Sequence, residues 1–199
     1  MKKGCYLLSD DTFSIDSNNG IGVHQKIVAQ IKAFNQNGFQ CDYLNLAKPK
    51  GSYFKKFFTI LFSTSLYSNI TVKEYDFLYI RRFIPLTRSF LLLLNKFKKK
   101  HPNIQIIYEV PTYPYDKEFS SPLLKFLLFT DKILRHRLKK YVDLITTYST
   151  HETIFGIPAL QILNGVDCSL IQVSKLNKKP NNSFRIIAVA QFAKWHGYD

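Results

Sequence analysis

The chain has 199 residues, 46% of them hydrophobic and 15% aromatic, and its 28 Lys and Arg against 14 Asp and Glu give a formal net charge of +14. At roughly 150 residues per domain, this length fits one domain with an appendage, and the apolar content excludes a disordered chain. The densest apolar run, residues 90–94, is far shorter than the roughly 18 residues that a membrane-spanning helix needs.

Strands and helices alternate along the chain. In order, the sequence predicts strand 3–9, helix 21–37, strand 39–46, helix 53–62, strand 76–80, helix 85–100, strand 104–110, helix 122–141, strand 143–147 and strand 159–163. The first helix is typical: its apolar residues recur at helical spacing, and it ends at Asn37-Gly38. This alternation predicts an α/β fold with a doubly wound, mostly parallel Rossmann-like sheet and helices on both faces.

The last part of the chain has a different composition. A polar segment rich in Lys, Asn and Pro precedes an apolar strand at residues 184–190. A strand buried on both faces needs neighbours for its backbone hydrogen bonds. We therefore expect a domain at residues 1–170, a linker at 171–183, and the first strand and loop of a truncated second domain at 184–199.

The positive charge favours an anionic partner, because a basic surface attracts the phosphates of nucleic acids, lipid headgroups or small molecules. The alternative is a basic surface that serves only solubility. The sequence contains no helix-turn-helix, zinc-finger or RNA-recognition signature, so we expect no nucleic-acid partner.

The three cysteines, Cys5, Cys41 and Cys168, are far apart and form no Cys-x-x-Cys pair. They favour buried thiols in a reducing cytoplasm over disulfides or metal ligands. The five histidines lack metal-ligand spacing. We expect no metal site.

Ligands of such sheets bind at the carboxyl ends of the strands. Asn18-Asn19-Gly20-Ile21-Gly22 follows the first strand and begins a helix, so its backbone N–H groups could hold a phosphate. An ordinary strand-to-helix turn explains the glycines equally well, because the full dinucleotide fingerprint is absent. His24, on the first turn of this helix, is expected to be a surface residue rather than an acid or base.

Two further strand ends carry charged residues. Arg81 and Arg82 could hold a phosphate or carboxylate bidentately, or could be ordinary solvated or ion-paired arginines. Glu109 ends an apolar strand, where an acid is costly unless it is paired or used. It could orient or deprotonate a sugar hydroxyl, or it could be the structural partner of Arg81 or Arg82.

Residues 53–62 and 122–141 combine cations with large apolar side chains. Such helices can lie on an anionic membrane, although Leu and Phe at helical spacing are more often core. Residues 53–62 are the better membrane candidate. The expected location is cytoplasmic, with a possible contact at the inner face of the cell membrane.

Several stretches carry a family resemblance. Residues 20–28 read Gly-Ile-Gly-Val-His-Gln-Lys-Ile-Val, residues 146–149 read Thr-Thr-Tyr-Ser, and residues 155–158 read Phe-Gly-Ile-Pro. Asn164-Gly165-Val166-Asp167 and Lys194-Trp195-His196-Gly197 follow in order. Together these stretches resemble retaining glycosyltransferases of family 4, whose two Rossmann-like domains face a cleft in the GT-B architecture.

The resemblance implies that the N-terminal domain binds a saccharide or lipid-linked acceptor, and that a second domain holds a nucleotide-sugar co-substrate without metal or other cofactor. It implies sugar transfer in surface-polysaccharide or glycolipid synthesis, with no turnover by residues 1–199 alone. The implied site residues fall into three groups: Gly20, Ile21 and Gly22 facing the donor phosphate; His24, Arg81, Arg82 and the candidate catalytic residue Glu109 on the acceptor side; and Asn164, Gly165, Asp167 and Lys194 between the domains. The alternative function is a non-catalytic basic Rossmann-like module that binds anionic membrane or nucleic acid.

Overall fold

The computed structural model describes residues 1–10, 13, 15, 22–46, 51–52, 58–60, 62–82, 85–116, 122–163 and 165. The chain divides into two units, Met1–Gly165 and Val166–Asp199, and every described residue belongs to the first. The predicted linker and final strand therefore lie outside the described residues. So do Cys168 and the interdomain candidates Asn164, Asp167 and Lys194.

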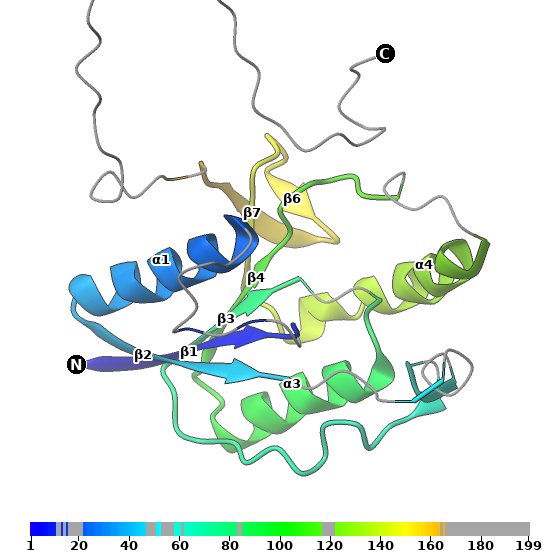
Figure 1. Ribbon diagram of the computed structural model, residues 1–199, viewed down its shortest axis with the longest axis horizontal. Coiled ribbons are helices and arrows are strands. Elements are labelled where there is room, and N and C mark those ends of the chain that lie inside the picture. Colours follow the sequence, from blue (N-terminus) through cyan, green and yellow to red (C-terminus); the bar gives the residue numbers. More distant parts are fainter. Residues whose placement is uncertain are drawn as a thin grey trace, which may run out of the picture. The chain divides into compact units, whose positions relative to one another are not determined.

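The described residues of the first unit form one sheet of seven strands (Figure 1). The strands are β1 (Lys2–Leu8), β2 (Phe39–Asn45), β3 (Phe77–Arg81), β4 (Gln105–Glu109), β5 (Leu144–Thr147), β6 (Thr153–Ile154) and β7 (Ile157–Gln161). Their order in the sheet is β2-β1-β3-β4-β5-β7-β6, and all neighbours are parallel except the β6–β7 pair. The predicted mostly parallel sheet is confirmed.

The direction of winding reverses at β1. This strand pairs with β2 on one side and with β3 on the other, so the chain first moves toward one edge of the sheet and then toward the opposite edge. The carboxyl ends of β1 and β3 therefore flank the position where ligands of open parallel sheets bind.

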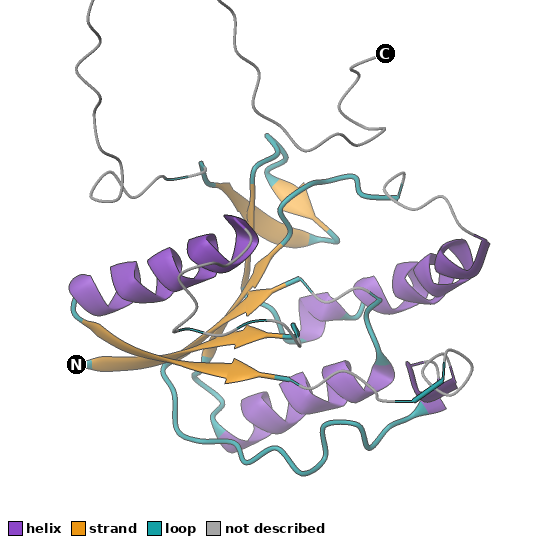
Figure 2. Ribbon diagram, in the orientation of Figure 1, coloured by secondary structure: helices purple, strands orange, loops and turns teal. Residues whose placement is uncertain are grey.

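Helices cover both faces of the sheet, as expected for a doubly wound fold (Figure 2). Helix α1 (Gly22–Gln36) lies on one face, whereas α3 (Arg88–Lys100) and α4 (Pro122–Arg135) lie on the other. The alternating side chains of the strands separate two cores. In β1, Tyr6 and Leu8 join the α1 core, while Cys5 and Leu7 join the larger core beneath α3 and α4.

Gly4 of β1 is required by a close approach within the sheet. It is the register partner of Phe77 in β3, and the Phe77 ring occupies the space that a Cβ at position 4 would need. The absence of a side chain at position 4 lets the Phe77 ring pack into the α1 core.

The boundaries of the described helices differ from the prediction by more than one residue at two places. Helix α3 begins at Arg88 rather than at residue 85, because the Thr87 side chain accepts a hydrogen bond from the Phe90 N–H and caps the first turn. Helix α4 ends at Arg135, and a short 3-10 turn, η1 (Leu138–Lys140), completes the connection to β5.

The β6–β7 hairpin was not predicted as such. Phe155 and Gly156 connect its strands with positive φ angles of 55° and 76°, the conformation of a tight type I′ turn. This turn is hard to predict from the sequence, because its first residue is Phe155 where Asn or Asp is usual. The ring of Phe155 instead packs edge-on against Tyr113 and Tyr115, at centroid distances of 5.5 and 6.2 Å.

Candidate functional site

Glu109 is the centre of the candidate site. It is the last residue of β4, and its side chain is 0% exposed. Lys26 Nζ and Arg81 Nη1 each donate to its Oε1 atom at 2.9 Å. The Tyr79 hydroxyl donates to Oε2 at 3.0 Å, and the Tyr148 hydroxyl to Oε1 at 3.4 Å. Two cations and two hydroxyls thus replace the water that this carboxylate loses on burial.

The parallel register of the sheet brings these residues together. Arg81 and Glu109 are register partners at the ends of β3 and β4, and Thr146 of β5 is the partner of Glu109. All three belong to the strand positions that face α1, because Tyr79 and Ile107, two residues earlier in β3 and β4, pack in the α1 core. Lys26 reaches the same place from α1.

A buried polar layer continues from Glu109 between α1 and the sheet. The Tyr79 hydroxyl lies 3.1 Å from Thr146 Oγ1 and 3.4 Å from Gln30 Nε2. Gln30 Oε1 accepts from the Tyr6 hydroxyl at 2.8 Å. Burial and the negative charge of Glu109 raise the pKa of Tyr79, which keeps its proton available for the carboxylate. Tyr79, Thr146 and Gln30 therefore fix the orientation of Glu109.

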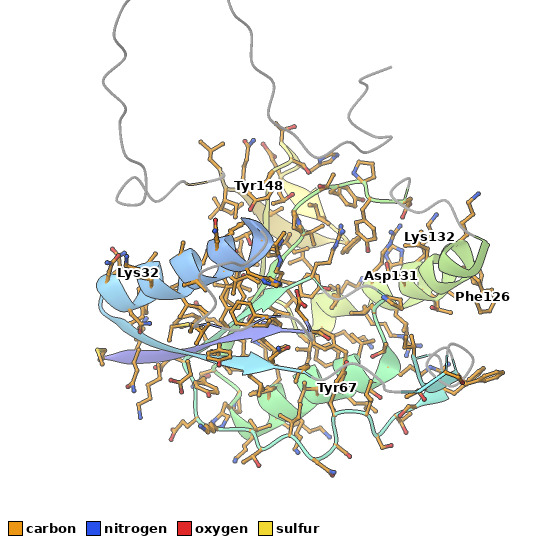
Figure 3. All side chains as sticks on the ribbon, in the orientation of Figure 1. Lys32, Tyr67, Phe126, Asp131, Lys132 and Tyr148 are labelled. Carbon is orange, nitrogen blue, oxygen red and sulfur yellow. The ribbon has the colours of Figure 1, made fainter. Side chains whose placement is uncertain are left out.

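The two cations reach the surface of the molecule. The Lys26 and Arg81 side chains are 21% and 20% exposed, while the carboxylate between them is fully enclosed. Lys26 Nζ also lies 4.2 Å from the centre of the Tyr148 ring, and Tyr148 lies near the first turn of α1 (Figure 3). Two positive charges against one negative charge give the cluster of Lys26, Arg81 and Glu109 a net positive charge.

His24 is buried, and the expectation of a surface position was wrong. It is 5% exposed, its Nε2 atom lies 2.9 Å from Asp10 Oδ2, and its ring meets Phe13 edge-on. Helix α1 turns this position toward the sheet, whereas the apolar Val23 beside it is exposed. The helical pattern favoured Val23 for the core, but the Asp10 carboxylate compensates the burial of the imidazole instead.

The structure separates Arg82 from Arg81. The Arg82 guanidinium stacks on the Tyr115 ring at 4.4 Å and donates to the Thr112 carbonyl at 3.4 Å, and Tyr115 belongs to the core beneath α3 and α4. Arg81 and Arg82 thus serve opposite faces of the sheet, and the structure brings only Arg81 to Glu109.

Arg82 instead joins a second polar cluster beside α4. Asp131 is 1% exposed and accepts from the Tyr115 hydroxyl at 2.6 Å and from the Leu86 N–H at 2.9 Å. Burial and the Asp131 charge raise the pKa of Tyr115. Arg135 donates to Asp116 at 3.0 Å. This cluster ties the loops after β3 and β4 to α4.

The glycine loop is described only at its end. Gly20 and Ile21 lie outside the described residues, and Gly22 is the exposed first residue of α1. A Cβ at Gly22 would meet no heavy atom of the described residues within 4 Å, so packing against the described part of the chain does not require a glycine there. Gly165 is likewise exposed and open. The phosphate-binding role of the loop stays a prediction.

A surface hollow of about 440 Å³ is lined by residues of α1, α3, β2 and the segment before β3, among them Asn35, Asp42 and Lys73. It borders the outer strand of the sheet rather than the carboxyl ends of β3 and β4.

Cys5 and Cys41 are free, buried thiols, as predicted. Within the described ranges, no three His, Cys, Asp or Glu side chains gather as metal ligands. None of the helices among these residues has the length and apolar character to cross a bilayer.

The sequence analysis singled out Glu109 and Arg81 but missed their partners. Lys26 and Gln30 are four residues apart on α1, beside the buried Ile27 and Ile31. Polar residues at that spacing along an apolar face were the available signal. No protein-family model and no curated protein matches this chain.

Proposed function

We propose that this chain forms the acceptor-side domain of a glycosyltransferase that moves a sugar from a nucleotide-sugar to a saccharide or lipid-linked acceptor. The single observation that carries this proposal is the cationic edge formed by Lys26 and Arg81 around the buried Glu109. It lies at the carboxyl end of β3, beside the point where strand order reverses. The order of motifs along the chain supports the same assignment.

Positive charge at this edge suits the chemistry of sugar transfer. The bond between the anomeric carbon and the donor diphosphate breaks, and the departing diphosphate gains negative charge. Cations held in place before the reaction stabilise such a charge without reorganising. The same cations can hold a phosphate or carboxylate on the acceptor.

Glu109 has a holding role in this proposal. Its carboxylate already accepts four hydrogen bonds and is closed to solvent. A general base must reach the proton that it removes. The enclosed carboxylate instead orients Lys26 and Arg81, which are the groups that reach the surface. We therefore assign contact with substrate to these two cations.

The test uses the complete reading frame that encodes this chain. The purified polypeptide is incubated with radiolabelled UDP- and GDP-sugars and with membranes of the source cells, and label is measured in lipid extracts and in polymer. We expect transfer from one nucleotide-sugar, and a loss of at least about tenfold in Lys26→Ala and Arg81→Ala, of the size seen when a positioned electrostatic group is removed.

Lys32→Ala is the matched control, because it removes a lysine from the exposed side of the same helix. Transfer equal to wild type is expected for this variant. Absence of transfer from every nucleotide-sugar would reject the proposed function. Measurable transfer by residues 1–199 alone would contradict the assignment of this chain to the acceptor side.

A further inference from the structure

Helix α4 exposes three large apolar side chains in one row. Phe126, Phe129 and Ile133 are 50%, 60% and 53% exposed. Their spacing of three and four residues places them within about 60° of one another around the helix, at about 100° per residue. We call this row the α4 apolar face. The sequence favoured core positions for Phe126 and Phe129, but Leu128 and Leu134 pack in the core instead.

Cations lie along one side of the α4 apolar face, and no acid lies within the row. Lys125 and Lys132 are exposed on that side, and Lys132 Nζ is 3.2 Å from Asp116 Oδ2. The single acidic residue of the helix, Asp131, points the opposite way and is 1% exposed. Figure 3 shows Phe126 and Lys132 at the same end of the first unit, and Lys32 of α1 at the other.

A pair of exposed aromatic side chains outside α4 is connected to this helix by hydrogen bonds. Phe58 and Phe62 are 56% and 68% exposed, and their rings stack at 5.9 Å. The Ser89 hydroxyl of α3 donates to the Ser63 carbonyl just after this pair. The loop before α3 is in turn held to α4 by the bond from Leu86 N–H to Asp131. Hydrogen bonds therefore connect both apolar segments.

We propose that the α4 apolar face, with Phe58 and Phe62, docks on an anionic lipid bilayer. Aromatic and aliphatic side chains beside lysines are what a helix lying in the headgroup region presents. The lysines match anionic headgroups. A second copy of this chain is disfavoured as the occupant, because two surfaces of a chain with net charge +14 repel each other. This docking does not depend on the proposed function.

The test measures binding of the full chain to sedimented vesicles of phosphatidylcholine alone and of phosphatidylcholine with 30% phosphatidylglycerol. We expect binding to the anionic vesicles that weakens as salt rises from 50 to 300 mM. The double variant Phe129→Gln/Ile133→Gln is expected to bind at least about tenfold more weakly at both salt concentrations, because it removes buried apolar area. Lys125→Glu is expected to bind about tenfold more weakly at 50 mM salt alone.

Two matched controls should bind as wild type. Leu160→Gln removes an exposed leucine of β7 that points away from the α4 side of the sheet, because Ile157 and Ala159 pack toward that side. Lys32→Glu makes the same charge change as Lys125→Glu on α1. Circular dichroism and urea unfolding verify that each variant is folded. The single variant Phe129→Gln replaces the double variant if the latter is unstable.

Four results would overturn the proposal. Two concern vesicles: the wild-type chain does not bind anionic vesicles, or the folded Phe129→Gln/Ile133→Gln variant binds them as well as wild type. Two concern other partners: the wild-type chain forms a dimer, or binds single-stranded RNA, and this variant abolishes that binding. Light scattering and fluorescence anisotropy with a labelled RNA cover the last two.

Discussion

Lys26 of α1 and Glu109 of β4 are 83 positions apart in the chain, yet their charged atoms meet at 2.9 Å. The carboxylate is fully buried, whereas the ammonium is partly open to solvent. Burial makes each partner depend on the other, because a charge removed from water without a counter-charge is strongly destabilising. The contact also joins α1 to the sheet.

Replacing Glu109 by Gln is therefore expected to lower the free energy of unfolding by about 3 kcal/mol, because Lys26 and Arg81 both lose their negatively charged partner. Urea unfolding measures the change. A double-mutant cycle with Lys26→Met isolates the pair, and we expect a coupling energy above about 1 kcal/mol. Additive effects of the two substitutions would show that the contact contributes nothing.

In the second polar cluster, the Tyr115–Asp131 hydrogen bond should stabilise the fold about as much as the Lys26–Glu109 contact does in the first. Asp131→Ala leaves the Tyr115 hydroxyl and the Leu86 N–H without their acceptor, and we expect a loss of about 3 kcal/mol in urea unfolding. Tyr115→Phe removes a single donor and should cost about half as much. Equal losses in the two variants would contradict the role of Leu86.

The stability of the chain should depend on Asp116 in a defined pH window. Burial alone would raise the pKa of Asp116, but hydrogen bonds and charges from Arg135 and Lys132 outweigh it and hold the pKa below its ordinary value of 3.8. Such a carboxyl stabilises the fold above its unfolded pKa, and this contribution is lost as pH falls through the folded pKa.

Asp116→Asn is accordingly expected to destabilise the chain at pH 7 by less than about 1 kcal/mol, because the pair is partly exposed. The difference from wild type should shrink as the pH falls below 3.8. Urea midpoints at pH 7, 5 and 3 test this, with Glu74→Gln as a control for the removal of an exposed carboxylate. A difference independent of pH would refute the ion pair as its source.

The buried thiols should be protected from alkylation. Burial raises the pKa of Cys5 to about 12 and that of Cys41 to about 11, so little thiolate forms at pH 8. We expect iodoacetamide to modify both at least about a hundredfold more slowly in the folded chain than in denaturant. Peptide mass spectrometry separates each site from Cys168. Rapid labelling of Cys5 in the folded chain would contradict its burial.

Gly4→Ala should destabilise the sheet by about 2 kcal/mol, because the new methyl group displaces the Phe77 ring from the α1 core. The smaller side chain of Phe77→Leu makes room, so the double variant should be more stable than Gly4→Ala alone. Thermal unfolding of the three variants measures this. No rescue would mean that the backbone, rather than the ring, resists the methyl group.

The sequence predicted the strands and the doubly wound sheet because their signals are local. Apolar runs such as Leu78–Ile80 and the Gly38 helix stop need no knowledge of distant residues. The partners of Glu109 depend instead on register across three strands and on the rotation of α1. Val23 and His24 are adjacent on α1, yet Val23 is exposed and His24 is buried. Helical periodicity does not predict which of two neighbouring positions is buried when the polar one has a hydrogen-bond partner in the interior.

The same limit explains the α4 apolar face. Periodicity showed that Phe126 and Phe129 lie on a helix, but Leu128 and Leu134 provide a competing apolar face. The choice between the two faces depends on Asp131, whose hydrogen bonds with Tyr115 and Leu86 orient the helix. A lone acid in an apolar helix was the sequence signal for that orientation.

Lys26 and Arg81 contact the same oxygen, Oε1 of Glu109, at equal distances. One atom thus serves as the shared anchor of a helix and a strand. The two cations share this oxygen, so an anion that draws one cation outward leaves the negative charge of Glu109 to the other. A ligand bound at one cation should then change the strength of the other cation's bond to Glu109 Oε1, without any movement of the sheet.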